Sequence, residues 1–298
     1  LYTPVKYILS LGGKRIRPAM MLMAYNMYRD DVDTILDPAL ALEMYHNFTL
    51  LHDDLMDNAD VRRGKPTVHK RWDANTAILS GDVMLTLADV YMSRVDDAYF
   101  REVMATFHTT SIEIAEGQQY DMDFETRDDV TEAEYIEMIR LKTSVLLACA
   151  LKIGAILGGA SEDDAAHLYR LGECIGLAFQ LRDDYLDVYG DPKVFGKKIG
   201  GDILCNKKTY LYINALRLAN KEQRAVLDYW VAASDFEPEE KIAAVTDIYN
   251  QVGLPAMSRA AEEHYYRQAL ASLEAISIGE DKKRVLREFM ATLMERDV

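Results

Sequence analysis

Two short aspartate clusters are the residues of this sequence best suited to chemistry. They occupy residues 53–57 (DDLMD) and 183–187 (DDYLD), and they alone among six Asp-Asp pairs carry a further aspartate four residues after the first. Residues four apart lie on one face of a helix, one turn above each other. The outer aspartates, Asp53 with Asp57 and Asp183 with Asp187, are therefore predicted to point the same way.

Carboxylates stacked in this way repel one another, and the repulsion is stronger in apolar surroundings. Both clusters follow apolar segments, so solvation alone would not relieve the repulsion, whereas a hard divalent cation would. Magnesium usually takes one or two carboxylates, several waters and phosphate oxygens of the substrate. A single cluster could equally be a solvated acidic face, but two copies predict facing turns that hold a metal-bound diphosphate.

Basic segments that contain glycine accompany the two clusters. Segment 12–18 (GGKRIRP) lies near the start, 60–67 (DVRRGKPT) follows the first cluster, and 191–202 (DPKVFGKKIGGD) with 206–209 (NKKT) follows the second. Glycine lets the backbone approach an anion, arginine binds phosphate oxygens bidentately, and lysine supplies a point charge. Any one segment could be a basic surface loop, but their presence in a chain with a net charge of -15 indicates anion sites.

The same net charge disfavours nucleic acid as a partner, because a phosphate backbone requires a basic face. Neither a P-loop nor a GxGxxG loop after a strand is present in the sequence. Cys149, Cys174 and Cys205 form neither a disulfide framework nor a zinc pattern, which predicts a reducing cytoplasm. The longest apolar run, 145–157, is broken by Lys152 and is too short to span a bilayer, so a buried helix and no transmembrane segment are expected.

Helices are the elements that must position these residues. Apolar residues recur at helical spacing, and no stretch alternates like a strand. The patterns precede the first cluster and cover residues 78–95, 103–114, 135–157, 165–188, 210–218 and 255–273. Thr131 with Glu134 indicates a capping box at a helix start. We predict an all-α bundle of about ten to thirteen helices around a central cavity.

The composition shows no break along the chain, which favours one domain over residues 1–298. The first residue is Leu1 rather than methionine, and the first eleven residues resemble the end of a helix. We therefore expect that a native N-terminal segment is missing.

In their order along the chain, these motifs resemble those of the trans-isoprenyl diphosphate synthases, the polyprenyl synthetase family, and especially its short-chain geranylgeranyl and farnesyl diphosphate synthases. The similarity runs from Gly12 to about Thr209 through GGKRIRP, HDDLMD with RRGKPT, and FQLRDDYLD with FGKKIGGD. The remaining C-terminal part matches weakly, and no role is carried over there. The resemblance implies an isoprenoid synthase-like fold, a trans-prenyltransferase that joins isopentenyl diphosphate head-to-tail to an allylic diphosphate, and a homodimer.

The resemblance also implies the residues of the site. Isopentenyl diphosphate would be held by Lys14, Arg17, His46 and Arg63, and the allylic diphosphate by Arg62, Lys142, Lys197 and Lys207. About three Mg²⁺ ions per active site would bind with the diphosphate, ligated directly by Asp53, Asp57 and Asp183 and through water by Asp54, Asp184 and Asp187. Thr143 and Gln180 would offer polar oxygens near the reacting carbons, and with Asp53, Asp57, Asp183, Lys142 and Lys197 they complete the catalytic set. His46 lies two helical turns before Asp53, although alone it could be a core histidine.

Product length is expected to depend on Phe48. By the same resemblance, the growing tail lies beside the helix that ends in the first cluster, and Phe48 lies about 7.5 Å deeper along that helix than Asp53. An aromatic ring there would stop the tail after a few isoprene units. A Phe that only fills the core would be hard to distinguish from this, because the wall of the tail's tunnel is itself part of the core. The first cluster has no insertion between its second and third aspartates, which departs from the bacterial farnesyl type and favours a C20 product over C15.

Other functions share parts of this pattern. A class I terpene cyclase or a head-to-head synthase would also be helical and magnesium-dependent, but a cyclase usually pairs one DDxxD with an Asn/Ser/Glu triad and lacks a second diphosphate pocket such as GGKRIRP. A non-catalytic subunit of a heteromeric synthase generally has eroded aspartates, and all six are present here.

Overall fold

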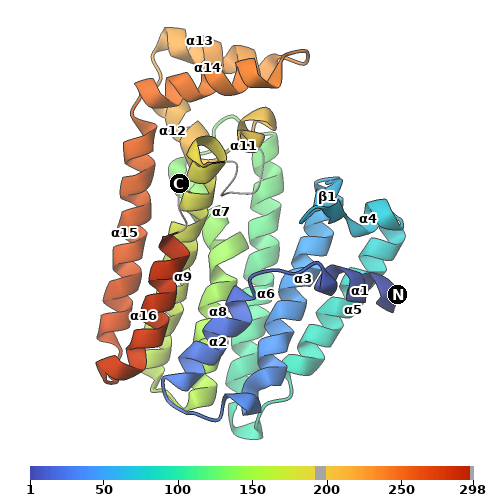
Figure 1. Ribbon diagram of the computed structural model, residues 1–298, viewed down its shortest axis with the longest axis vertical. Helices are drawn as coiled ribbons and strands as arrows, with labels where there is room; N and C mark the ends of the chain where they lie inside the picture. Colours follow the sequence, from blue (N-terminus) through green and yellow to red (C-terminus); the bar gives the residue numbers. More distant parts are fainter. Residues whose placement is uncertain (192–198, 296–298) are drawn as a thin grey trace. The chain divides into compact units, whose positions relative to one another are not determined.

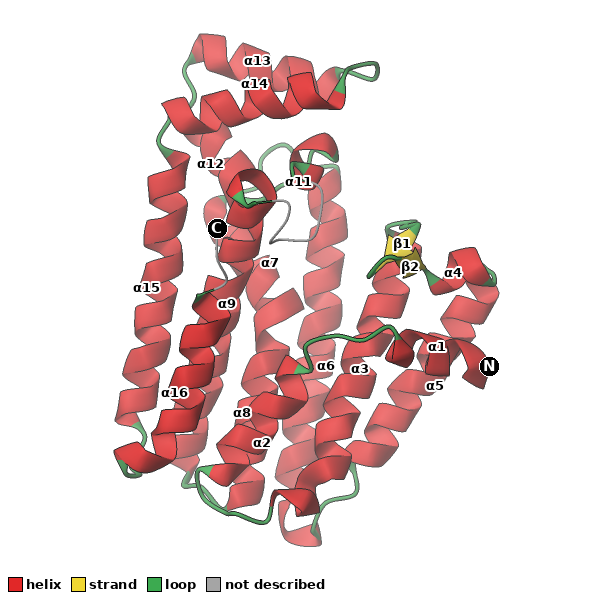
Figure 2. Cartoon of the chain, viewed as in Figure 1, coloured by secondary structure: helices red, strands yellow, loops and turns green. Residues whose placement is uncertain are grey.

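A computed structural model describes residues 1–191 and 199–295 of the chain. Within this part, the regular secondary structure is helical apart from one two-stranded hairpin (Figure 2). The all-α prediction is therefore confirmed. Lys197, to which the resemblance assigns a role in the site, lies outside the described residues.

The chain divides into two compact units, each built from segments that are distant in the sequence. The first unit comprises Leu1–His108, Cys149–Ala166 and Ile278–Lys282, and the second comprises Thr109–Ala148, His167–Ser277 and Lys283–Val298. Several boundaries fall inside long helices, among them α6 (Asp97–Glu125), α8 (Val145–Gly158) and α9 (Glu162–Tyr189). The single domain expected from the sequence stays a prediction.

In the first unit, helix α3 (Leu36–Met56) ends within the first aspartate cluster. It packs along α5 (Ala74–Met92), and Figure 1 shows the two helices side by side. Gly81 of α5 permits this close packing, because a Cβ atom there would lie 2.1 Å from Nε2 of His52. The other elements of this unit are α1 (Tyr2–Ser10), α2 (Ile16–Asn26), η1 (Val32–Ile35), β1 (Val61–Arg62), β2 (Lys65–Pro66), α4 (Val68–Arg71), the first part of α6, the larger part of α8 and the starts of α9 and α16.

The basic segment after the first cluster forms a tight hairpin where the sequence predicted a loop. Arg62 of β1 pairs with Lys65 of β2, and the two residues between them have positive φ angles, 52° for Arg63 and 74° for Gly64. Two left-handed central residues are typical of a type I′ turn, whose twist matches that of the paired strands. The turn therefore fixes the backbone directions of the two neighbouring arginines.

In the second unit, α9 carries the second aspartate cluster near its C-terminal end. The capping box predicted at Thr131 is confirmed, because its amide donates to the Glu134 carboxylate at 2.8 Å and its hydroxyl accepts from the Glu134 amide. The other elements of this unit are the second part of α6, α7 (Glu132–Ile139), η2 (Arg140–Ser144), the first turn of α8, α11 (Gly201–Leu204), α12 (Tyr210–Leu218), α13 (Lys221–Ala232), α14 (Pro238–Gln251), α15 (Leu254–Ala275) and most of α16 (Glu280–Met294).

The apolar run 145–157 belongs to a longer helical stretch, as the helical pattern over residues 135–157 indicated. Elements α7, η2 and α8 join into Glu132–Gly158, whose 27 residues are long and apolar enough to cross a bilayer by length and composition alone. However, 83% of the most apolar 18-residue segment of this stretch is buried inside the protein. The burial agrees with the core helix that the sequence predicted for residues 145–157.

A π-helical turn, η2, interrupts this stretch at the predicted site residues Lys142 and Thr143. The amide of Val145 donates to the carbonyl of Arg140, five residues back, and such turns are frequent at functional sites. Gly117 of α6 lies against the turn, because a Cβ atom there would be 2.4 Å from the backbone nitrogen of Lys142. Close packing against α6 therefore supports the backbone that carries the two site residues.

We expect Gly117→Ala to lower the free energy of unfolding by roughly 1–3 kcal/mol, because the added methyl group would push these two backbones apart. Chemical denaturation measures this change. Glu116→Ala, at an exposed position one residue earlier on α6, is the control and should change the free energy by less than about 0.5 kcal/mol. Equal stability of Gly117→Ala and the wild type would contradict the close packing.

Candidate active site

The first aspartate cluster lies at the C-terminal end of α3. Asp53 is partly exposed, Asp54 is buried, and Asp57 follows the last helical residue and is exposed. The amide of Asp57 donates to the carbonyl of Asp53 at 2.9 Å, so the two residues are one helical turn apart. The C-terminal end of a helix carries partial negative charge, and three carboxylates add to it. This end of α3 is therefore electrostatically suited to a cation.

Arg62 of the hairpin contacts this cluster. Its Nε donates to Oδ2 of Asp54 at 2.7 Å, and its Nη2 lies 3.9 Å from Oδ2 of Asp53. Burial raises the pKa of Asp54, and the hydrogen bond from Arg62 opposes that rise. Asp54 therefore orients Arg62, while Asp53 and Asp57 remain on the more exposed side of the helix end.

Residues that the resemblance assigns to isopentenyl diphosphate gather in the first unit. Nη1 of Arg17 lies 3.2 Å from Nε2 of His46. Arg63 lies against Gly13, where a Cβ atom would be 2.9 Å from the guanidinium nitrogens. Lys14 is the next residue in the same loop. The glycine thus lets the basic loop close over the arginine of the hairpin.

Arg17 has the features of an anion-binding residue. Its Nε atom is buried and has no hydrogen-bond partner among the described residues, and removal of the guanidinium from water lowers the pKa of Arg17 to about 10. A buried donor without an acceptor costs roughly 1–3 kcal/mol. A phosphate oxygen would satisfy this donor and offset that cost.

Glu43 of α3 anchors the basic segment 12–18 through Arg15. The sequence interpretation missed this glutamate. The Glu43 carboxylate pairs with Arg15 and accepts from Nδ2 of Asn47 at 2.8 Å. Arg15 also donates to the carbonyl of Leu9 at 2.8 Å. The signal available in the sequence was a Glu and an Asn four residues apart within an otherwise apolar helix. Polar groups buried in such a helix require hydrogen-bond partners.

The environment of His46 keeps its imidazole neutral. Burial lowers the pKa of His46 well below its usual value, and the positive charges of Arg17 and Arg63 lower it further. An unfolded chain binds a proton at this histidine near pH 6.5, whereas the folded chain does not. Folding stability at this position is therefore present above that pH and is lost as the pH falls.

We expect the wild type to lose about 1 kcal/mol more stability than His46→Gln between pH 7.5 and pH 5.5. Urea denaturation of the two proteins at a series of pH values measures this difference. Parallel pH profiles would show that His46 titrates normally in the folded state, contrary to the cationic surroundings described here.

The second aspartate cluster lines a pocket that lies entirely within the second unit. The pocket contains residues that the sequence placed in one site and five that it did not, three of them polar. Of the predicted residues, the lining includes Lys142, Thr143, Gln180, Asp183, Asp184, Asp187 and Lys207. The lining also includes Asp121, Tyr135 and Asp202, together with the apolar Met138 and Ile139.

Asp184 faces inward and is held by several donors. Its Oδ1 accepts from Nε2 of Gln180 at 3.1 Å, and its Oδ2 accepts from the hydroxyl of Tyr135. Burial raises the pKa of Asp184 to about 7 and the charge of Asp202 adds to the rise, while these hydrogen bonds oppose it. Gln180 in turn accepts from Oγ1 of Thr143 at 3.3 Å. This chain of bonds connects the π-helical turn to α9.

Two further carboxylates in this pocket were missed because their partners are distant in the sequence. Asp121 of α6 forms an ion pair with Nζ of Lys142. The backbone amide of Asp202 donates to Oδ2 of Asp187 at 3.0 Å, which ties the segment after α9 to the cluster. Asp202 stands in the FGKKIGGD motif, so its place there was the only signal in the sequence.

The carboxylates of each unit suit magnesium as oxygen donors. Among residues 1–191 and 199–295, no three His, Cys, Asp or Glu side chains converge closely enough to hold an ion by themselves. Magnesium does not require this, because it usually takes one or two carboxylates and completes its shell with water and phosphate oxygens. The residues present therefore fit an ion that arrives together with a diphosphate.

Comparisons with known proteins agree with this arrangement. The polyprenyl synthetase family model matches residues 1–249. This chain belongs to the polyprenyl synthetase family. The geranylgeranyl diphosphate synthase of Methanosarcina mazei is 46% identical over 217 residues, which cover 72% of this chain and 67% of the relative. The short chain isoprenyl diphosphate synthase of Methanothermobacter thermautotrophicus is 37% identical over 293 residues, 98% of this chain and 89% of the relative.

A crystal structure of a geranylgeranyl pyrophosphate synthase has a TM-score of 0.95 and 47% sequence identity, and the match covers 100% of this chain and 92% of that one. The family resemblance found in the motifs is thus confirmed. The family match also extends beyond Thr209, where the motifs end, to residue 249. Helices α12 and α13 and most of α14 therefore belong to the polyprenyl synthetase match as well.

Phe48 of this polyprenyl synthetase lies on α3 in an aromatic row. Its ring centre is 5.5 Å from that of Tyr45 and 4.8 Å from that of His52, both in edge-to-face geometry. Tyr45 in turn lies 5.4 Å from Phe107 of α6. The ring is partly buried and packs against the cluster that contains Leu51. Phe48 is therefore fixed by aromatic neighbours rather than free to swing away.

Proposed function

We propose that this polyprenyl synthetase is a magnesium-dependent trans-prenyltransferase that joins an allylic diphosphate head-to-tail to isopentenyl diphosphate. The observation that carries the proposal is the pocket of the second unit, where Asp183 and Asp187 occur with Lys142 and Lys207. A pocket lined by both signs of charge suits an anion bound together with its counter-ions. The names of the two relatives support the same reaction class.

Bound magnesium would act as a Lewis acid on the diphosphate oxygens. Lys142 and Lys207 bind those oxygens and stabilise the negative charge that develops as the allylic carbon–oxygen bond breaks. The oxygens of Thr143 and Gln180 face the carbon that becomes positive. The double bond of isopentenyl diphosphate then attacks this carbon, and the released diphosphate takes the proton that is lost, so no protein nucleophile is required.

The second substrate, isopentenyl diphosphate, would bind in the first unit. Arg17 and Arg63 provide guanidinium groups for its phosphates, Lys14 adds a flexible charge, and neutral His46 donates a hydrogen bond. The unpartnered Nε of Arg17 supports this assignment. Arg62 would bind the allylic diphosphate instead, because it lies beside the aspartates of the first cluster.

Both aspartate clusters are proposed to hold magnesium. Asp53 and Asp57 of the first cluster and Asp183 of the second would ligate about three magnesium ions, which would supply positive charge for the diphosphate. Asp184 and Asp187 would act through water or through their hydrogen bonds. The negative end of α3 supports a cation at the first cluster.

A C20 product, geranylgeranyl diphosphate, is proposed, with C15 as the alternative. The tail would extend beside α3 and stop at the ring of Phe48, which Tyr45 and His52 hold in place. The name of the Methanosarcina mazei relative supports the C20 assignment.

We expect a homodimer in the cytoplasm. Helix α5 exposes Ile78, Leu79, Leu85 and Val90, a set of large apolar side chains that a second copy of this helix would cover. Sedimentation of the purified protein tests this, and a monomer at micromolar concentration would contradict it.

The reaction is tested with purified protein, magnesium, radiolabelled isopentenyl diphosphate and each allylic starter in turn. The proposal predicts label in a linear prenyl diphosphate, and chromatography gives its length. A terpene cyclase would consume the allylic diphosphate without incorporating label, and a non-catalytic subunit would consume neither substrate. Either result would overturn the proposal.

A further inference from the structure

Lys241 of α14 is a buried lysine that the proposed chemistry does not use. Its residue is 1% exposed. Nζ donates to Oδ1 of Asn206 at 2.7 Å and to the carbonyl of Leu204 at 3.4 Å, and it lies 4.6 Å from the ring centre of Phe236. Both hydrogen bonds therefore go to the short segment that immediately precedes Lys207.

Packing alone does not account for a lysine at this position. In the described part of the chain, no carboxylate lies within ion-pair distance of Lys241. A buried ammonium without such a partner is costly, whereas methionine would occupy a similar volume at little cost. The hydrogen bonds to residues 204–206 are what the lysine provides and the methionine would not.

Asn206 transmits these contacts to the site. Its φ is 55°, a left-handed conformation, and its Nδ2 donates to the carbonyl of Val231 in α13 at 3.3 Å. The next residue, Lys207, lines the pocket of the second unit, and its amide donates to the carbonyl of Asp202 at 2.9 Å. The turn at Asn206 thus sets where Lys207 enters the pocket, and Lys241 holds that turn.

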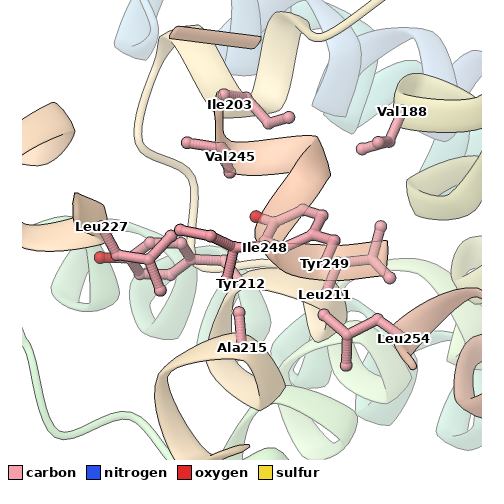
Figure 3. Close-up of a cluster of buried hydrophobic side chains, with 10 residues drawn as sticks. All are labelled: Val188, Ile203, Leu211, Tyr212, Ala215, Leu227, Val245, Ile248, Tyr249 and Leu254. Carbon is pink, nitrogen blue, oxygen red and sulfur yellow. The ribbon is translucent and has the colours of Figure 1, made fainter. Parts of the chain in front are cut away.

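Helix α14 also contacts the start of the same segment. Gly200 has a φ of 83°, and a Cβ atom there would lie 2.6 Å from Cδ1 of Ile242. Between the two ends, Ile203 packs beside Val245 of α14 in one apolar cluster (Figure 3). Successive positions along α14 therefore hold the whole segment from residue 200 to residue 206.

We propose that Lys241 is a positioning residue that fixes Lys207 for diphosphate binding, an inference that rests on the proposed function. Lys241 acts through Asn206 and does not touch the substrate. A lysine that only stabilised the fold would lower the melting temperature when replaced and would leave the diphosphate affinity of the folded protein unchanged. The two roles therefore differ in a measurable way.

The test is a double-mutant cycle of Lys207→Met and Lys241→Met. The probe is inorganic pyrophosphate with magnesium, titrated by calorimetry below the melting temperature of each variant. We expect each single change to raise the dissociation constant about tenfold, and Lys241→Met to raise it less than about twofold further when Lys207 is already methionine. Steady-state kinetics should show the Lys241→Met effect in kcat/KM for the allylic diphosphate.

Lys221→Met is the matched control, because Lys221 is an exposed lysine at the start of α13. It should leave the dissociation constant unchanged. Additive effects of the two methionines would overturn the inference, as would an unchanged dissociation constant in Lys241→Met or in Lys207→Met. If the wild type makes no prenyl diphosphate in the assay above, the proposed function fails first, and that outcome is distinct from additivity in an active enzyme.

Asn206→Gly provides a second route if Lys241→Met does not fold. Glycine keeps the left-handed backbone but removes the carboxamide that accepts the hydrogen bond from Lys241. It should raise the dissociation constant for magnesium pyrophosphate about as much as Lys241→Met, again only when Lys207 is present. A folded Asn206→Gly protein with wild-type affinity would overturn the inference.

Discussion

Replacement of Asp183 by asparagine should reduce prenyl transfer by at least about two orders of magnitude, a loss of about 3 kcal/mol of transition-state stabilisation. Asparagine keeps the shape of the side chain but removes the negative charge that would bind magnesium. Asp53→Asn should have an effect of similar size for the same reason. Turnover at saturating magnesium, isopentenyl diphosphate and allylic diphosphate measures both effects.

Asp163→Asn is the matched control for Asp183→Asn. It changes an aspartate of another Asp-Asp pair on the same helix, at an exposed position in the first turn of α9. There the carboxylate interacts with the helix dipole, so its loss should cost less than about 1 kcal/mol of stability and leave turnover intact. A folded Asp183→Asn enzyme that retains near wild-type turnover would refute the metal role of the second cluster.

Phe48→Ala should shift the main product to a longer chain by one or more isoprene units. Removal of the phenyl ring opens space beside α3, because Tyr45 and His52 contact that ring edge-to-face and do not occupy its volume. Truncation of a partly buried phenylalanine also costs stability, roughly 1–3 kcal/mol, so products should be compared below the melting temperature. Reversed-phase chromatography of dephosphorylated products gives the chain-length distribution.

Phe100→Ala serves as the control for this change, since Phe100 of α6 is an exposed phenylalanine. Its product distribution should match that of the wild type. If Phe48→Ala gives the wild-type distribution as well, Phe48 does not limit the tail, and the C20 assignment loses its structural support.

Local signals in the sequence predicted much of the helical framework and part of the site. Periodic apolar residues located α3, α9 and α12 because each of these helices buries one face. The Thr131 cap was predictable because the partners of a capping box are three residues apart. The same locality explains the aspartate clusters, whose spacing of four is a property of a single helix.

Contacts between distant segments could not be predicted in the same way. Tyr135 and Asp184 are 49 residues apart in the sequence, and no local pattern indicates that a tyrosine of α7 would donate to the second cluster. Asp121 is similar, because only the fold brings α6 to Lys142. Lys241 follows two glutamates near a helix start, and nothing local in that sequence indicates that the lysine is buried.

Backbone geometry was the other feature that the sequence did not predict. The π-helical turn at 140–144 and the left-handed Arg63 leave little trace in residue types, since neither depends on glycine or proline at the position itself. Both features nevertheless set the directions of proposed site residues. Irregular backbone of this kind costs more free energy than a regular helix or loop, and it is typical of functional sites.

The central proposal is that the aspartates of both clusters bind magnesium when a diphosphate is present. A crystal structure with manganese in place of magnesium and a non-hydrolysable allylic diphosphate analogue tests this directly, because anomalous scattering locates each ion. We predict ions ligated by Asp53 and Asp57 and a further ion ligated by Asp183. Ions at only one of the two clusters would contradict the account.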